Sequence, residues 1–150
     1  MTKPRMRTVA LSVVALAVIA QLVPINRDNP PVGVGLAAPD RVAPTLRRAC
    51  YDCHSHETAW PWYAYVAPAS WMVARDVHEG RRHVNFSDWG AYSAPEQQRR
   101  LLDIADEVKE GGMPPWYYAP FHAGSALSQA DVDTIVGWAE SASAQLAGKP

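Results

Sequence analysis

Apolar residues recur at the spacing of an α-helix in three stretches of the chain. Because residues three and four apart share one face of a helix, this pattern predicts amphipathic helices over residues 69–82, between Ser93 and Gly111, and from Ser128 onward. The apolar faces are Trp71, Val73, Ala74 and Val77 in the first helix, Leu101, Ile104, Ala105 and Val108 in the second, and Val132, Ile135, Val136 and Ala139 in the third.

Local signals mark where these helices begin. Ser93 precedes Glu96 by three residues, which is the spacing of a capping box, and Ser128 precedes Asp131 in the same way. A further helix is predicted over residues 42–53, with Pro44 in its first turn, where proline is tolerated. No stretch alternates with a period of two residues, so the predicted fold class is all-α with long loops.

The N-terminal part of the chain has a different pattern. An uncharged apolar run from Thr8 to Ile25 follows a short basic stretch. Its 18 residues just reach the length of a membrane-spanning helix, about 17 at the lower limit, and no small-residue cleavage site directly follows. We therefore expect a transmembrane anchor, with a cleaved signal peptide as the alternative. The basic N-terminus predicts a single pass through the cytoplasmic membrane, with the rest of the chain on the periplasmic, extracytoplasmic side.

The 150 residues accommodate one ordinary domain and a leader. We expect an anchor or signal peptide over residues 1–25, an extended Pro/Gly-rich tether without contacts over residues 26–39, and a folded domain over residues 40–150. A hydrophobic content of 48% suits a packed core. Residues 28–150 carry ten basic and fifteen acidic groups, which argues against nucleic acid as a partner.

Cys50 and Cys53 are the only cysteines, and His54 follows directly. On a helical turn, two sulfurs three residues apart lie on one side and reach the two vinyl groups of a porphyrin, while the adjacent imidazole binds the iron. This spacing is that of c-type haem attachment. The expected cofactor is thus one covalently attached haem c with its iron.

Three other interpretations fit the Cys50–His54 motif less well. A disulfide between Cys50 and Cys53 closes too short a loop to add much stability. A zinc site needs further ligands, for which only four scattered histidines are available. A thioredoxin-like redox site needs surrounding strands, and none is predicted. The candidate zinc ligands are His56, His78, His83 and His122.

The chain resembles a bacterial haem-binding domain family of single-haem c-type proteins. The resemblance covers residues 40–140 and rests on Cys50 to His54, the Trp-Pro-Trp-Tyr stretch at 60–63, residues 76–89, and Gly112-Met113-Pro114-Pro115-Trp116-Tyr117. More distantly, the order of haem motif, Met-Pro and final amphipathic helix is similar to class I cytochrome c. The resemblance implies a cytochrome c-like helical domain around one haem, with electron transfer as its activity.

Met113 is the expected sixth ligand of the iron, opposite His54. Flanking glycines and prolines hold its segment out of a helix, so that a rigid loop presents the thioether. His122 is the alternative ligand, and the remaining histidines are expected at the surface. Met72, beside Trp71, is expected in the core.

Other residues are candidates for contact with the haem. The domain is rich in tryptophan, and a porphyrin offers apolar surface for indole rings to cover, although ordinary core packing is the alternative. Arginines are candidates to neutralise propionates, with a solvated face as the alternative. The residues concerned are Trp60, Trp62, Trp71, Trp116, Arg75, Arg81 and Arg82.

No catalytic constellation of the Ser/His/Asp or paired-carboxylate type occurs, so the predicted protein is an electron carrier rather than an enzyme. The alternative is a haem sensor or small-ligand site, including weak peroxidase activity, with an open sixth position. The expected partners are a redox protein at the membrane and the membrane itself.

Overall fold

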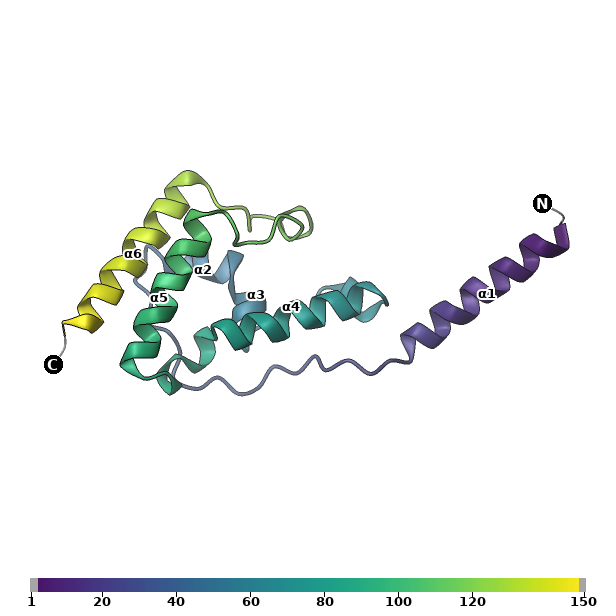
Figure 1. The fold of residues 1–150 in the computed structure, drawn as a ribbon, viewed down its shortest axis with the longest axis horizontal. Coiled ribbons are helices and arrows are strands. Elements are labelled where there is room, and N and C mark those ends of the chain that lie inside the picture. The colour runs from purple at the N-terminus through teal and green to yellow at the C-terminus, as the bar shows by residue number, and fades with distance from the viewer. Residues whose placement is uncertain (1–2, 149–150) are drawn as a thin grey trace.

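The computed structural model describes residues 3–148, and every regular element in that range is a helix (Figure 1). The all-α prediction is therefore confirmed. The α-helices are α1 (Lys3–Gln21), α2 (Ala43–Ala49), α3 (Tyr51–His54), α4 (Ala69–His83), α5 (Ala94–Lys109) and α6 (Gln129–Ala147). Short 3₁₀ helices are η1 (Trp62–Tyr65), η2 (Phe86–Ala91) and η3 (Ala119–Phe121).

The hydrophobic core lies where α5 and α6 pack side by side in opposite directions (Figure 1). α5 contributes Leu101, Ala105 and Val108 at the spacing that the sequence predicts, and α6 buries Ile135 and Ala139 completely. α2 and η2 close this core. Its remaining buried members are Val42, Leu46, Val84, Phe86, Trp89 and Trp138.

Both predicted helix starts are confirmed. The backbone N–H of Ser93 donates to Glu96 Oε2 over 2.9 Å, and that of Ser128 donates to Asp131 Oδ2 over 2.9 Å. These side chains satisfy amides that the first helical turn leaves free. The helix predicted over residues 42–53 is interrupted at Cys50, where φ is −125° and ψ is −34°, so it forms α2 and α3 instead.

The predicted burial of Trp71 and Met72 is wrong, since they are 41% and 51% exposed. α4 packs against α3 and η1 rather than against the α5–α6 pair. Its enclosed positions are Ser70, Val77 and Gly80, so the face that turns inward is narrower than the apolar stripe suggests.

α1 projects away from the remaining helices (Figure 1). It begins in the basic stretch at Lys3 and ends at Gln21, so it does not coincide with the apolar run from Thr8 to Ile25. Among the described residues, no helix combines the length and the apolar character needed to cross a bilayer. The expected transmembrane helix is therefore not found, because charged residues occupy the start of α1 and the helix stops before the apolar run ends.

Residues 26–39, here called the linker segment, are extended as expected but not free of contacts. Gly33 N–H donates to Ser87 O over 3.0 Å, Leu36 N–H donates to the carbonyl of residue 86 over 2.7 Å, and the amide of Gly90 donates to Val34 O over 2.8 Å. The expectation that this segment touches nothing is wrong. The linker segment lies in an extended conformation along η2 and is held there by backbone hydrogen bonds. Hydrophobic periodicity does not reveal such bonds.

Candidate functional site

The break at Cys50 positions the motif Cys50–His54. The N–H groups of Cys53 and His54 both donate to Cys50 O, over 3.2 and 2.9 Å, so the motif forms one tight turn at the end of α2. Both thiols are free and half-buried. Burial raises the pKa of each, to about 12, which is the opposite of the lowered thiol pKa typical of redox-active Cys-X-X-Cys sites.

The imidazole of His54 is oriented by two backbone carbonyls. Its Nδ1 lies 2.9 Å from Gly80 O and 3.1 Å from Val84 O. Both partners are acceptors, so Nδ1 carries the proton and donates, which leaves the lone pair on Nε2. Burial lowers the pKa of His54 and keeps the ring neutral. A neutral imidazole held through Nδ1–H with Nε2 free is the form that ligates a metal.

Gly80 is a site residue that the sequence analysis missed. A Cβ at this position would lie 2.5 Å from Cys53 O and 3.1 Å from Cys53 Cβ. Only glycine lets α4 approach the motif so closely, and the same residue supplies the carbonyl for His54. The available signal was a glycine inside an otherwise amphipathic helix, which often marks close packing.

The loop between α5 and η3 carries Met113, whose side chain is 36% exposed. Two following residues attach this loop to the motif side of the fold. The Tyr118 hydroxyl donates to Asp52 Oδ2 over 2.7 Å, and the Tyr117 hydroxyl donates to Asp76 Oδ2 over 3.2 Å. The structure thus brings the loop of Met113 against α3 and α4.

His122 differs from His54 because both of its ring nitrogens have protein partners. Nδ1 lies 3.0 Å from Tyr118 O, and Nε2 lies 3.2 Å from the Tyr63 hydroxyl. Its ring also stacks on Tyr118 at 3.7 Å. His56 is likewise held through both nitrogens, to Pro31 O and to an Asn side chain. His78 and His83 are exposed, as predicted.

Of the three candidate arginines, Arg81 is committed to protein contacts. Its guanidinium donates to Ser55 O over 2.7 Å, to Asp28 O over 2.8 Å and to Thr58 Oγ1 over 2.9 Å. It therefore joins the segment after the motif to the linker segment. Arg82 pairs with Glu79 on its own helix and, like Arg75, is exposed.

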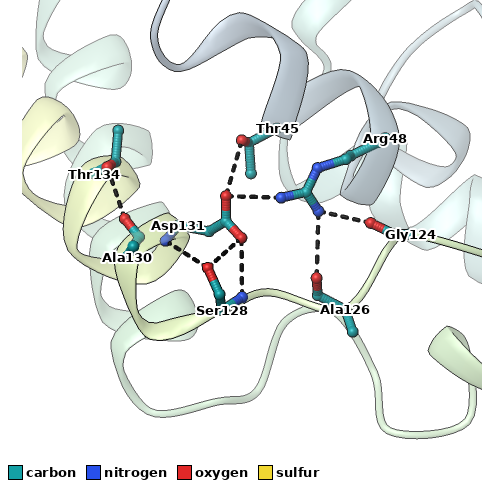
Figure 2. Close-up of polar contacts among 8 residues, drawn as sticks. All are labelled: Thr45, Arg48, Gly124, Ala126, Ser128, Ala130, Asp131 and Thr134. Carbon is teal, nitrogen blue, oxygen red and sulfur yellow. Dashed lines mark hydrogen bonds and ion pairs between the residues drawn. The ribbon is translucent and has the colours of Figure 1, made fainter.

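A polar network anchors α2, the helix that leads into Cys50 (Figure 2). Asp131 Oδ1 lies 2.7 Å from Arg48 Nη2 and 3.2 Å from Thr45 Oγ1, while Oδ2 caps α6 at Ser128. Hydrogen bonds from Ser128 and then Arg48 hold the pKa of the Asp131 carboxyl well below its usual range. Arg48 also donates to the carbonyl of Gly124, over 2.7 Å. The network ties the motif to the end of the long loop.

The residues present fit a haem. Two thiols and an imidazole with a free Nε2 share one turn, and apolar side chains remain exposed on α4, which packs on α3, and on η1, η3 and the Met113 loop. The buried Trp60 Nε1–H has no partner, so it remains available to a carboxylate. Among the described residues, no group of three or more His, Cys, Asp or Glu side chains suits a metal ion, which leaves the zinc alternative without a ligand set. The exposed apolar residues concerned are Trp62 on η1, Trp71 on α4, Trp116 in the Met113 loop and Phe121 on η3.

These features define a haem-binding α-helical domain. The family model for the haem-binding domain matches residues 15–141, and the chain belongs to this family. Neither the curated proteins nor the solved structures contain a match.

Proposed function

We propose that this protein is a single-haem c-type cytochrome that carries electrons on the extracytoplasmic side of the membrane. The observation that supports it best is the arrangement at His54. Its Nδ1–H is held by the carbonyls of Gly80 and Val84, and its Nε2 is free beside two thiols on one turn. A helical domain of this family with that donor set has the parts that covalent haem attachment requires.

In this proposal Cys50 and Cys53 hold the haem covalently. Each thiol adds across a vinyl group: the sulfur bonds to one vinyl carbon, the thiol hydrogen ends on the other, and the double bond becomes single. The step is redox-neutral and needs no external oxidant. Because both thiols are half-buried and lie on one helical turn, these two residues would hold the haem beside α3.

In the same proposal, His54 and Met113 are the residues that would bind the haem iron. When bound, the haem supplies one-electron transfer at its iron. The hydrogen bonds to Nδ1 orient the ring and increase the basicity of Nε2, while the thioether favours ferrous iron. His122 is the weaker candidate, because Tyr63 and the carbonyl of Tyr118 already occupy both of its nitrogens.

Membrane attachment is part of the proposal on the strength of the sequence and of the exposed surface of α1. Apolar side chains are exposed along that helix, among them Leu11, Leu16 and Ile19. Such a helix, basic at its start, is suited to contact with lipid. Fractionation of expressing cells before and after replacement of residues 1–25 by a cleavable export signal tests this part, with release of the haem domain from the membrane fraction as the expected result.

Covalent attachment is tested in cells with a working export and haem-ligation system. Thioether bonds survive denaturation, so we expect peroxidase staining to follow the polypeptide in a denaturing gel. Replacing both Cys50 and Cys53 by alanine should abolish the stain, whereas staining that persists would refute the assignment. Reversible one-electron reduction, followed by absorption, then tests the carrier function. Rapid carbon monoxide binding by the unmutated ferrous protein would instead favour the sensor.

A further inference from the structure

Two adjacent tyrosines attach the Met113 loop to two separate elements. Tyr118 donates its hydroxyl hydrogen to Asp52 inside the Cys50–His54 motif, and Tyr117 donates to Asp76 on α4, over 2.7 and 3.2 Å. Burial raises the pKa of both phenols, so they remain protonated donors at neutral pH. Hydrogen bonds to charged acceptors are stronger than those between neutral groups.

Asp52 is a rigid acceptor. Its other oxygen, Oδ1, accepts the N–H of Ala59 over 2.9 Å, and its backbone carbonyl accepts the Thr58 hydroxyl over 2.7 Å. The carboxylate is therefore shared between the chain that follows the motif and the loop that carries Met113. A displacement of the loop breaks the bond to Tyr118 without releasing Asp52.

The segment that contains Met113 is held at both ends. On the side of α5, the N–H groups of Gly112 and Met113 donate to Glu107 O over 2.9 and 3.2 Å. On the side of η3, the hydrogen bonds of Tyr117 and Tyr118 to Asp76 and Asp52 attach the segment. Between these two points, the described contacts of residues 113–116 leave the thioether free to meet a ligand.

We infer that Asp52 and Asp76 are positioning residues which, through Tyr118 and Tyr117, hold the Met113 loop over the haem face and keep the sixth position closed. This inference rests on the proposed ligation by Met113. The two hydrogen bonds from Tyr118 to Asp52 and from Tyr117 to Asp76 are here called the clasp. If the clasp is lost, the loop opens more often and the thioether would no longer stay at the iron. Each hydrogen bond to a charged group is strong enough to change the open fraction about tenfold.

The test uses the full-length haem protein and the variants Tyr117→Phe, Tyr118→Phe and the double variant, which keep both rings. We measure the rate of carbon monoxide association with the ferrous protein and the urea midpoint at which the ferric iron–sulfur absorption disappears. We expect about tenfold faster association in each single variant and about a hundredfold in the double variant. The absorption should disappear at lower urea than the helical circular dichroism.

Three further variants separate positioning from general stability. Tyr92→Phe is the matched control. The hydroxyl of Tyr92 accepts a hydrogen bond from the N–H of Asn85 over 3.0 Å, so removing it does not affect the hydrogen bonds that attach the Met113 loop. It should leave the association rate unchanged. Asp76→Asn keeps a carbonyl oxygen that can accept from Tyr117, so its rate of carbon monoxide association should stay close to that of the parent. Asp76→Ala removes the acceptor and should bind carbon monoxide as fast as Tyr117→Phe.

Met113→Ala serves as the reference that distinguishes two kinds of failure. If Met113→Ala speeds carbon monoxide binding and the double tyrosine variant stays within about twofold of the parent, the clasp is refuted and methionine ligation stands. If Met113→Ala itself changes neither absorption nor rate, ligation by Met113 is refuted, and the inference falls with it. A variant with parental circular dichroism and a rate equal to that of Tyr92→Phe counts against the clasp.

Discussion

The Nδ1 of His54 lies 2.9 Å from the carbonyl oxygen of Gly80, and the Cα of the same glycine faces the backbone of Cys53. One residue of α4 thus fixes both the distance between α4 and the motif and the tautomer of the imidazole. A larger residue at position 80 would push α4 away from α3 and lengthen the hydrogen bond between His54 and the carbonyl of residue 80. The orientation of the histidine therefore depends on packing at a position 26 residues away in the chain.

Gly80→Ala should therefore destabilise the fold and reduce haem incorporation. The new methyl group meets Cys53 O at 2.5 Å, and overpacking of this kind costs about 1–3 kcal/mol. Urea unfolding and haem staining per mole of protein measure the two effects. Gly137→Ala is the control, since nothing lies within 4 Å of a Cβ at that position. Because alanine favours a helix more than glycine does, this change in the middle of α6 should raise the free energy of unfolding by up to about 1 kcal/mol. Equal behaviour of the two variants would contradict the packing argument.

Met113→Ala should remove the iron–sulfur absorption of the ferric protein, lower the potential and admit carbon monoxide. The reason is that a soft thioether favours ferrous iron, and its loss opens the sixth position. Met72→Ala is the matched control. Because Met72 is 51% exposed, its truncation should leave the spectrum unchanged and cost less than about 1 kcal/mol. If His122→Ala alters spectrum and potential while Met113→Ala does not, the iron has two histidine ligands.

Acid should weaken the contact between α2 and α6. Hydrogen bonds from Ser128 and the charge of Arg48 depress the pKa of Asp131 in the folded state, so its contribution is complete above the unfolded pKa of about 4 and declines as the pH falls further. Asp131→Asn should be less stable at pH 7 but lose less stability between pH 5 and pH 3. Asp133→Asn, two residues further along α6, is the control in urea unfolding at both pH values, because Asp133 accepts a hydrogen bond only from Gln129 of its own helix among the described contacts.

Truncation should distinguish α1 from the linker segment when a cleavable export signal replaces the residues that are removed. Deleting residues 1–25 leaves the backbone hydrogen bonds of Gly33 and Leu36 in place, so the stability of the haem domain should be preserved. Deleting residues 1–38 removes those bonds together with the contacts that Asp28 and Asn29 make with Arg81, and should cost about 2–4 kcal/mol. Equal urea midpoints for the two deletions would show that the linker segment adds nothing.

Predictions that depend on neighbours in the chain were the successful ones. Ser93 with Glu96 and Ser128 with Asp131 act within one turn, so their spacing is visible in the sequence and the helices begin there. The apolar positions of α5 and α6 were also predicted, because both helices bury one broad face against each other. The burial of Trp71 was predicted wrongly, because α4 packs on α3 through a close contact between Gly80 and Cys53 rather than on α5 and α6. The sequence alone does not show which helix is the neighbour.

The sequence by itself determined the all-helical class, the starts of α5 and α6, and the Cys50–His54 motif, whose three side chains are brought together by a single turn of backbone. Only the tertiary structure decided which carbonyls hold His54, that Asp52 accepts Tyr118, and that the linker segment covers η2. These contacts join residues 26 to more than 50 positions apart. Such pairs leave no periodic signal, because their geometry depends on how whole helices and loops pack, and that packing is settled by shape and by the pairing of buried polar groups.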